Sequence, residues 1–283
     1  MAKEIIISNE KIKCTISALG AEIQSVVKES KELIWEGNPD VWSGRAPVLF
    51  PICGGLKDDK YVFEGKDYTL SKHGFARKSE FLVEECDQQK ATFLLRATEE
   101  TKKVYPFDFE LRVTYTLIDT QIKVDYQVTN LGEYDMYYSI GSHEAYACPE
   151  GIEEYSVVFD EEETLDSSVL NGNLLEYNTV CFGNNIKELP LKYDFFAIDA
   201  LVFLDIKSRK VSLMHNDEKV VDVCFDGADY LLLWTKPTGK YICIEPWCGV
   251  PDFEDSDYDI TNKRGIIKVL PGKASKKTHT LTF

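Results

Sequence analysis

The chain has 283 residues, of which 44% are hydrophobic and 12% aromatic, so it can bury a large core and is not a disordered protein. Its formal net charge is −16, which argues against nucleic acid and anionic membranes as partners, because both are bound mainly through Lys and Arg. No apolar run approaches the ~18 residues of a membrane span, so no membrane association is predicted.

Alternation of apolar and polar residues with a period of two runs through most of the chain and predicts many short β-strands, the first at residues 12–19. A short turn is expected within 38–45, and the acidic segment 149–168 is expected to cross the surface. In chain order, hairpins are predicted over residues 61–70, 81–95, 109–128, 201–214 and 230–244. Because no linker or repeat divides it, the chain is predicted to be all-β, a single large β-sandwich domain over residues 1–283.

Eight cysteines are spread along the chain without a C-x-x-C pair or a zinc-ligand spacing. The first residues, MAKEIIISNEKIK, lack the apolar segment of a secretory signal peptide. A core of this size does not need disulfide bonds. We therefore expect free thiols and a cytoplasmic location.

The segment KYICIEPWCG, residues 240–249, predicts a strand with an ionisable group on one face. Alternation places Tyr241, Cys243 and Glu245 together on that face. Pro246 has no N–H to continue a ladder, so the strand is predicted to end before it. Glu245 would then stand at a strand terminus, where a scaffold commonly presents a functional group.

Two of the four histidines have unusual surroundings. His73 precedes Gly74 in SKHGFAR, and His143 follows small residues in YYSIGSHEAYACP, so a ligand has room beside each. Either one can also be a structural histidine that holds a backbone group. His215, in a turn-like HNDE, and His279, in a polar tail, are predicted to be exposed.

Two further charged residues stand next to apolar runs. Arg45 precedes the run APVLF and either pairs with a structural carboxylate or points its planar fork at a ligand. Asp199 interrupts FFAIDALVFL, where a carboxylate needs a partner, so it belongs to a polar network or contacts a ligand.

His73 and His143 are far apart in sequence and have no local ligand pair, so no metal is expected. A G-x-S-x-G elbow, a P-loop and a G-x-G-x-x-G fingerprint are all missing from the sequence.

Taken in order, four segments resemble the aldose 1-epimerase (mutarotase) family. They are GRAPVLF through KHGFAR at residues 44–77, SIGSHEAYACP at 139–149, FFAIDAL at 195–201 and ICIEPW at 242–247. The resemblance covers nearly the whole chain and is strongest to the bacterial mutarotase-like branch, whose substrates are less settled. It implies a galactose mutarotase-like supersandwich with an open cleft.

The resemblance also implies roles for single residues. Glu245 would be the general base and His143 the general acid, while Arg45, His73 and Asp199 would hold sugar hydroxyls and the ring oxygen. Interconversion of anomers moves one proton off the C1 hydroxyl and another onto the ring oxygen, so one base and one acid suffice without a cofactor. An ionised Glu245 is expected to favour the imidazolium form of His143.

The substrate is less defined than the reaction. KHGFAR replaces the His-Gly-Gly of the galactose branch, and Glu144 follows His143 where that branch often has proline. The leading prediction is an isomerase that acts on a free hexose. The alternative is the same chemistry on a hexose 6-phosphate, with Lys72, Arg77 and Lys78 as the phosphate site.

Two other classes of protein remain as alternatives. A non-catalytic carbohydrate-binding module would not need an acid–base pair. A glycoside hydrolase would use Glu245 and Asp199 as its two carboxylates and would leave His143 without a role. A small-molecule sugar is the expected partner, and no pattern in the sequence defines an oligomeric state.

Overall fold

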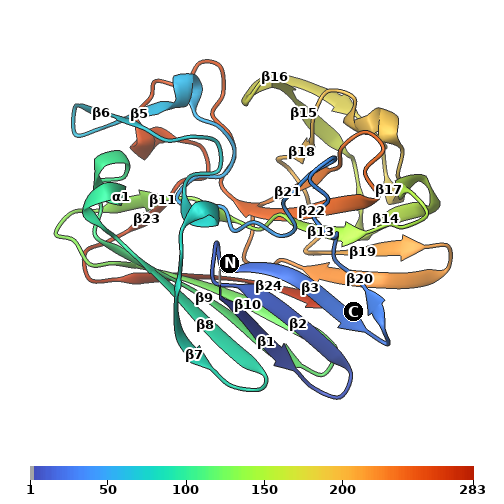
Figure 1. Cartoon of the computed structure of the whole chain (residues 1–283). Helices are drawn as coiled ribbons and strands as arrows, with labels where there is room; N and C mark the ends of the chain where they lie inside the picture. Colours follow the sequence, from blue (N-terminus) through green and yellow to red (C-terminus); the bar gives the residue numbers. More distant parts are fainter. Residues whose placement is uncertain (1–2) are drawn as a thin grey trace.

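Two large antiparallel sheets form the body of the protein, whose computed structural model describes residues 3–283 (Figure 1). The larger sheet has nine strands in the order β17-β14-β19-β20-β24-β10-β9-β8-β7. In chain order these are β7 (Leu82–Cys86), β8 (Lys90–Arg96), β9 (Phe109–Ile118), β10 (Gln121–Asn130), β14 (Tyr155–Glu163), β17 (Ile186–Pro190), β19 (Lys210–His215), β20 (Glu218–Cys224) and β24 (Ala274–Thr282).

The second sheet has seven strands, drawn above β24, β10 and β9 in Figure 1. Its order is β12-β22-β21-β18-β15-β16, and β13 also pairs with β22. The strands are β12 (Ile140–Gly141), β13 (Glu144–Ala147), β15 (Asp166–Asn171), β16 (Leu174–Cys181), β18 (Leu201–Phe203), β21 (Tyr230–Trp234) and β22 (Tyr241–Cys248).

Smaller elements complete the structure. A four-stranded sheet contains β1 (Glu4–Ser8), β2 (Ile12–Ser17), β3 (Glu22–Lys28) and β4 (Lys31–Glu32). Two further pairs are β5 (Lys60–Phe63) with β6 (Lys66–Thr69), and β11 (Met136–Tyr138) with β23 (Ile267–Val269). The helical segments are α1 (Glu99–Val104) and the 3₁₀ turns η1 (Lys57–Asp59), η2 (Ala76–Lys78), η3 (Ile152–Glu154), η4 (Tyr193–Phe196) and η5 (Ile260–Asn262). Within residues 3–283, no helix is long and apolar enough to cross a membrane.

Alternation along the strands gives the seven-stranded sheet two different faces. One face joins the main hydrophobic cluster, which draws Ile244 from β22, Leu281 from the nine-stranded sheet and Ile16 from the four-stranded sheet. We call this the core face. The opposite face carries two smaller clusters, around Trp247 and around Cys243, and we call it the cavity face. The predicted all-β class and β-sandwich architecture are confirmed.

The register of the strands tests the predicted hairpins. Four of the five are confirmed, as β5–β6, β7–β8, β9–β10 and β21–β22. The hairpin predicted over 201–214 is wrong, because β18 lies in the seven-stranded sheet and β19 in the nine-stranded sheet. Residues 149–168 likewise supply β14 and β15, one to each large sheet, instead of crossing the surface. The turn within 38–45 is present, and the eight cysteines are free thiols.

Candidate active site

A cavity of about 480 Å³ opens over the cavity face of the seven-stranded sheet. Segments distant in sequence supply its lining, from strands β15, β21 and β22 and from loops between residues 42 and 77 and between 196 and 200. Trp42, Trp234 and Trp247 give it aromatic walls, and Trp42 stacks on His143 with ring centroids 5.1 Å apart. The charged and imidazole side chains that line it are Lys72, His73, Arg77, His143, Asp199, Lys236 and Glu245. Four of the five predicted site residues are therefore brought together.

The floor of the cavity lies where one strand of the sheet is interrupted. β22 pairs with β12 at Trp247 and with β13 at Ile244, so the two residues between them, Glu245 and Pro246, face the break between β12 and β13. The strand does not end at Pro246, and that prediction is wrong. The carbonyl of Pro246 accepts the N–H of Ser142 from the side of the break, and a residue's N–H and C=O point to the same side of a strand. An N–H on Pro246 would therefore point toward the break and not toward β21, so its absence removes no hydrogen bond between β22 and β21.

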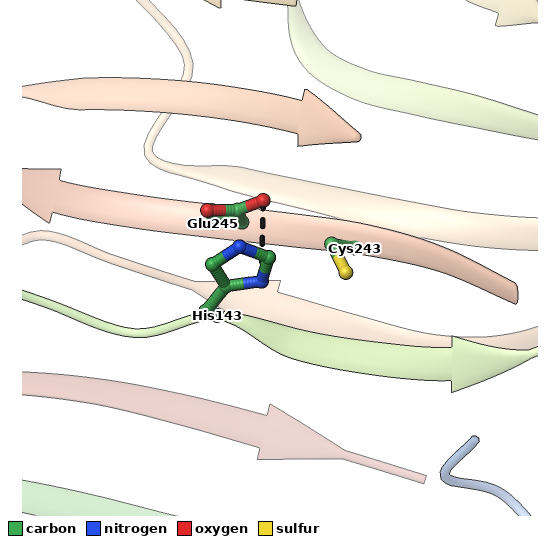
Figure 2. A group of neighbouring side chains, drawn as sticks. All are labelled: His143, Cys243 and Glu245. Carbon is green, nitrogen blue, oxygen red and sulfur yellow. Dashed lines mark ion pairs between the residues drawn. The ribbon is translucent and has the colours of Figure 1, made fainter. Parts of the chain in front are cut away.

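His143 lies in this break and contacts Glu245 (Figure 2). Its Nδ1 is 3.4 Å from Oε1 of Glu245, and the two residues are 9% and 1% exposed. In a sugar ring the C1 hydroxyl oxygen and the ring oxygen are bonded to the same carbon. An acid and a base that serve both oxygens must therefore lie within a few ångströms of each other, as these two do.

Burial controls the charge of both groups. It raises the pKa of Glu245 well above its usual value, and the ammonium of Lys72 opposes this shift. Burial, together with the cations Lys72 and Arg77, lowers the pKa of His143 to about 3. Burial thus favours a protonated Glu245 beside a neutral His143. The expectation that Glu245 makes His143 an imidazolium is wrong for this structure, because desolvation outweighs their attraction.

His73 is held in one tautomer. Its Nδ1 accepts the N–H of Gly54 at 3.1 Å, so in the neutral ring the proton is on Nε2. Burial and the neighbouring His143 lower the pKa of His73, which keeps the ring neutral. The residue has a φ of +68°, and a Cβ on Gly74 would lie 2.3 Å from the carbonyl oxygen of Phe50, so this turn requires glycine. The tight turn thus offers a fixed, uncharged hydrogen-bond donor.

Asp199 and Lys72 lie close together on the wall of the cavity. Asp199 follows η4, where its Oδ1 accepts the N–H of Ala200, and its Oδ2 lies 3.8 Å from Nζ of Lys72. Both side chains are partly exposed, so each can exchange the other for a ligand. Lys72 was predicted only as part of a phosphate site, but it is also the cation that acts most on Glu245.

Arg45 is the predicted site residue that the structure does not bring into the cavity. Its Nη1 donates to the carbonyl of Gln24, and its own N–H donates to the carboxylate of Glu22. The guanidinium therefore ties the chain to β3. Lys78 is exposed and does not line the cavity either, whereas Arg77 does and donates through Nη2 to the carbonyl of Lys72 at 2.9 Å.

The two histidines predicted to be exposed are not. His215 is half-buried and stacks on Tyr155, with centroids 4.5 Å apart. His279 is 4% exposed, and its Nε2 lies 2.9 Å from Oε1 of Glu144. The polar composition of the C-terminal segment does not reveal that β24 lies inside the nine-stranded sheet, where His279 and Leu281 are buried.

One group of side chains has the chemistry of a metal site. The ligand atoms of His143, Cys243 and Glu245 all lie within 4.8 Å of one another (Figure 2). An N, S and O set of this kind suits zinc. A bound ion would use both Glu245 and His143 as ligands. Burial also raises the pKa of the Cys243 thiol well above its usual value, which disfavours the thiolate that a metal would need. That no metal takes part in the reaction stays a prediction.

An all-β sandwich whose aromatic-walled cavity holds a carboxyl–imidazole contact defines a galactose mutarotase-like protein. Residues 3–268 match the family model described as aldose 1-epimerase, and the chain belongs to this family. It is 36% identical to the chromosomal protein LacX of Lactococcus lactis subsp. lactis, over 99% of each chain.

Two solved structures have the same fold over nearly their whole length. One is a galactose mutarotase related enzyme from Lactobacillus acidophilus, with a TM-score of 0.93 and 35% identity, covering 99% of this chain and 97% of that one. The other is a galactose mutarotase-like protein from Lactobacillus casei ATCC 334, with a TM-score of 0.93 and 27% identity over 99% of both chains. The predicted family is therefore confirmed.

Proposed function

We propose that this protein is a cofactor-independent aldose 1-epimerase that interconverts the α and β anomers of a free hexose. The observation that carries the proposal is the 3.4 Å contact between Glu245 and His143 on the floor of a sugar-sized cavity. Membership of the aldose 1-epimerase family supports the same reaction. With its eight free thiols, the protein is proposed to work in a reducing cytoplasm.

In the proposed reaction, Glu245 takes the proton of the C1 hydroxyl and His143 gives a proton to the ring oxygen. The C1–O5 bond breaks, C1 becomes the carbon of an aldehyde, and the aldehyde rotates. The ring then closes on its other face, and the protons return by the reverse transfers. No atom is gained or lost, and no electrons leave the sugar, so acid and base suffice.

The pair needs one proton between its two members. In the working form this proton is on His143 and Glu245 is ionised, whereas burial favours the form with the proton on Glu245. Both forms hold the same number of protons, so the rate follows the two macroscopic pKa values of the pair. Lys72 supports the working form, because its charge lowers the pKa of Glu245. We expect a bell-shaped dependence of kcat on pH.

The remaining lining residues are proposed to bind the sugar. The Nε2–H of His73 can donate to a hydroxyl or to the ring oxygen, and the carboxylate of Asp199 can accept from hydroxyls. Trp42 and Trp234 offer aromatic faces of the kind that line small-molecule pockets. Arg45 has no place in this set.

The test is the rate at which freshly dissolved α-anomers equilibrate, measured by polarimetry or NMR across a panel of hexoses and hexose 6-phosphates. Glu245→Gln keeps the shape of the side chain but removes the base, so kcat should fall by at least about 10²-fold while sugar binding survives. A wild-type rate in Glu245→Gln would exclude this mechanism. Sugar binding by the wild-type protein without any acceleration would instead indicate a carbohydrate-binding protein.

A hexose 6-phosphate is the second candidate substrate. The observation that favours it is that two cations, Lys72 and Arg77, line the cavity, although the third predicted cation, Lys78, does not. The same panel distinguishes the two substrates. If the phosphate is bound, Arg77→Ala should raise KM for the 6-phosphate and leave KM for the free hexose nearly unchanged.

A further inference from the structure

Glu144 and His279 form a buried polar pair that the proposed reaction does not use. Their contacting atoms, Oε1 and Nε2, lie 2.9 Å apart, and the residues are 3% and 4% exposed. Glu144 follows His143 directly, but alternation turns its side chain to the opposite face of the sheet. His279 comes from β24, inside the nine-stranded sheet. The pair therefore crosses the core between the two large sheets, behind the acid–base contact.

Apart from neighbouring tyrosines, the surroundings of this pair are apolar. Ile244, opposite Glu144 on β22, and Leu281, two residues after His279 on β24, are both fully buried in the main cluster. Burying a polar pair of this kind costs desolvation, and apolar side chains of the same volume are often as stabilising. Oε2 of Glu144 has no hydrogen-bond partner among the described residues, which adds to its cost. A purpose other than stability is therefore indicated.

The position of Glu144 in the strand suggests that purpose. Strand β13 resumes at Glu144 after the break that presents His143, and Glu144 stands opposite Ile244, the residue before Glu245. The ladder with β22 and the backbone bond from Ala145 to Arg45 hold β13 within its own layer. A bond from Glu144 to another sheet adds a tie at the residue that directly follows His143.

We propose that Glu144 and His279 are positioning residues, which tie the strand after His143 to the opposite sheet and place a carboxylate behind the acid–base pair. This inference rests on the proposed function. The carboxylate also acts through space, because the charges of Asp199 and Glu144 add to the effect of burial in raising the pKa of Glu245. Loss of the Glu144 charge should therefore lower that pKa.

Other titratable groups around the pair do not change this reasoning. Burial raises the pKa of the tyrosines and of the cysteine beside Glu144, so they stay uncharged near neutral pH. The titratable groups that interact with Glu144, by contact or through space, are Tyr146 on its own strand, Tyr115 on β9, Tyr126 on β10, Cys243 and Glu245 on β22, and His279 on β24. His279 itself stacks on Tyr126, with centroids 5.6 Å apart.

Three variants of the whole protein test the proposal. Glu144→Gln keeps a hydrogen-bond acceptor for His279 and removes the charge. His279→Leu removes the tie. Leu281→Ala is the matched control, because it damages the same strand and the same face of the core without touching the pair. For each variant, kcat and KM are measured against pH at a temperature where it is folded.

In Glu144→Gln the acidic limb of the kcat/KM profile should move down by about one pH unit, as expected when a carboxylate is removed near another at an effective dielectric of about 20. In His279→Leu, kcat should fall about tenfold below that of Leu281→Ala, with KM changed little, because a misplaced acid slows the chemical step. Profiles and kcat values equal to the control in both variants would overturn the proposal.

A second readout does not depend on catalysis. The imidazole resonances of His143 should shift in Glu144→Gln and His279→Leu but not in Leu281→Ala, and the four histidines of the chain keep the spectrum simple. If the wild-type protein accelerates no sugar in the panel, the proposed function fails, and these resonances still decide the positioning role. Unchanged resonances in both variants would refute it.

Discussion

Replacing Glu245 with glutamine should make the protein more stable, besides lowering kcat by at least about 10²-fold. Burial raises the pKa of this carboxyl in the folded protein, so the folded state holds a proton that the unfolded chain releases above about pH 4.3. A raised pKa in the folded state gives stability that is present at low pH and is lost as pH rises towards the folded value. Glutamine carries no proton to release and removes this loss.

The size of the effect follows from proton linkage. Each pH unit between the unfolded and the folded pKa lowers the free energy of unfolding by about 1.4 kcal/mol. Between pH 4.3 and 6.3 the wild-type protein should therefore lose about 2.7 kcal/mol relative to Glu245→Gln, if its folded pKa lies above that range. The pKa values of His73 and His143 are lowered in the folded protein, so these histidines reduce its stability as pH falls, which is the opposite direction. Both the wild-type protein and Glu245→Gln contain them. Their contribution largely cancels in the difference.

The assay is urea denaturation of both proteins at several values of pH between 4 and 8, followed by tryptophan fluorescence. Glu163→Gln is the matched control, because it removes another carboxyl that is 1% exposed, one that accepts N–H bonds from Lys207 and Ser208 and does not line the cavity. A difference between wild type and Glu245→Gln that stays flat with pH would refute the reasoning, and would mean that Lys72 holds Glu245 ionised throughout.

Two further predictions concern the cations. Lys72→Met removes the charge that lowers the pKa of Glu245, so the acidic limb of kcat/KM should move to higher pH; an unmoved limb would limit Lys72 to contact with the sugar. Arg45→Ala removes the bond to the carbonyl of Gln24, so the melting temperature should fall while KM changes by less than about threefold. A large rise in KM would contradict this prediction and show that Arg45 takes part in binding the substrate.

Period-two alternation predicted the sheets well because it reports which side of a strand is buried. It does not report which sheet a strand joins, so it predicts a hairpin over 201–214 where the chain crosses from β18 in one large sheet to β19 in the other. The same limit explains His279, whose neighbours in sequence are polar while its neighbours in space are Tyr126 and Glu144. Burial at such a position depends on strand order, which local composition does not contain.

The residues of the cavity were predicted by family resemblance more than by pattern. His73 and Glu245 occur in short motifs, and the structure brings them to the same cavity as His143 and Asp199. Arg45 occurs in an equally good motif, but its guanidinium reaches Gln24 instead. A sequence motif gives the position of a residue in the chain. The direction of a long side chain such as that of Arg45 depends instead on the hydrogen-bond acceptors near it in the folded structure.

The break between β12 and β13 explains how an acid–base pair can form in the middle of a sheet. In an unbroken ladder, Glu245 and His143 would belong to neighbouring strands with every backbone group paired, and Pro246 would leave one group without a donor. The break removes that requirement, so the proline is tolerated and His143 can turn over Glu245. Beyond the break, β13 rejoins its ladder with β22 and makes further backbone bonds to Trp35 and Arg45. The bond from Glu144 to His279 adds a tie to the opposite sheet at the first residue of β13, and this is why a polar pair in the core is reasonable here.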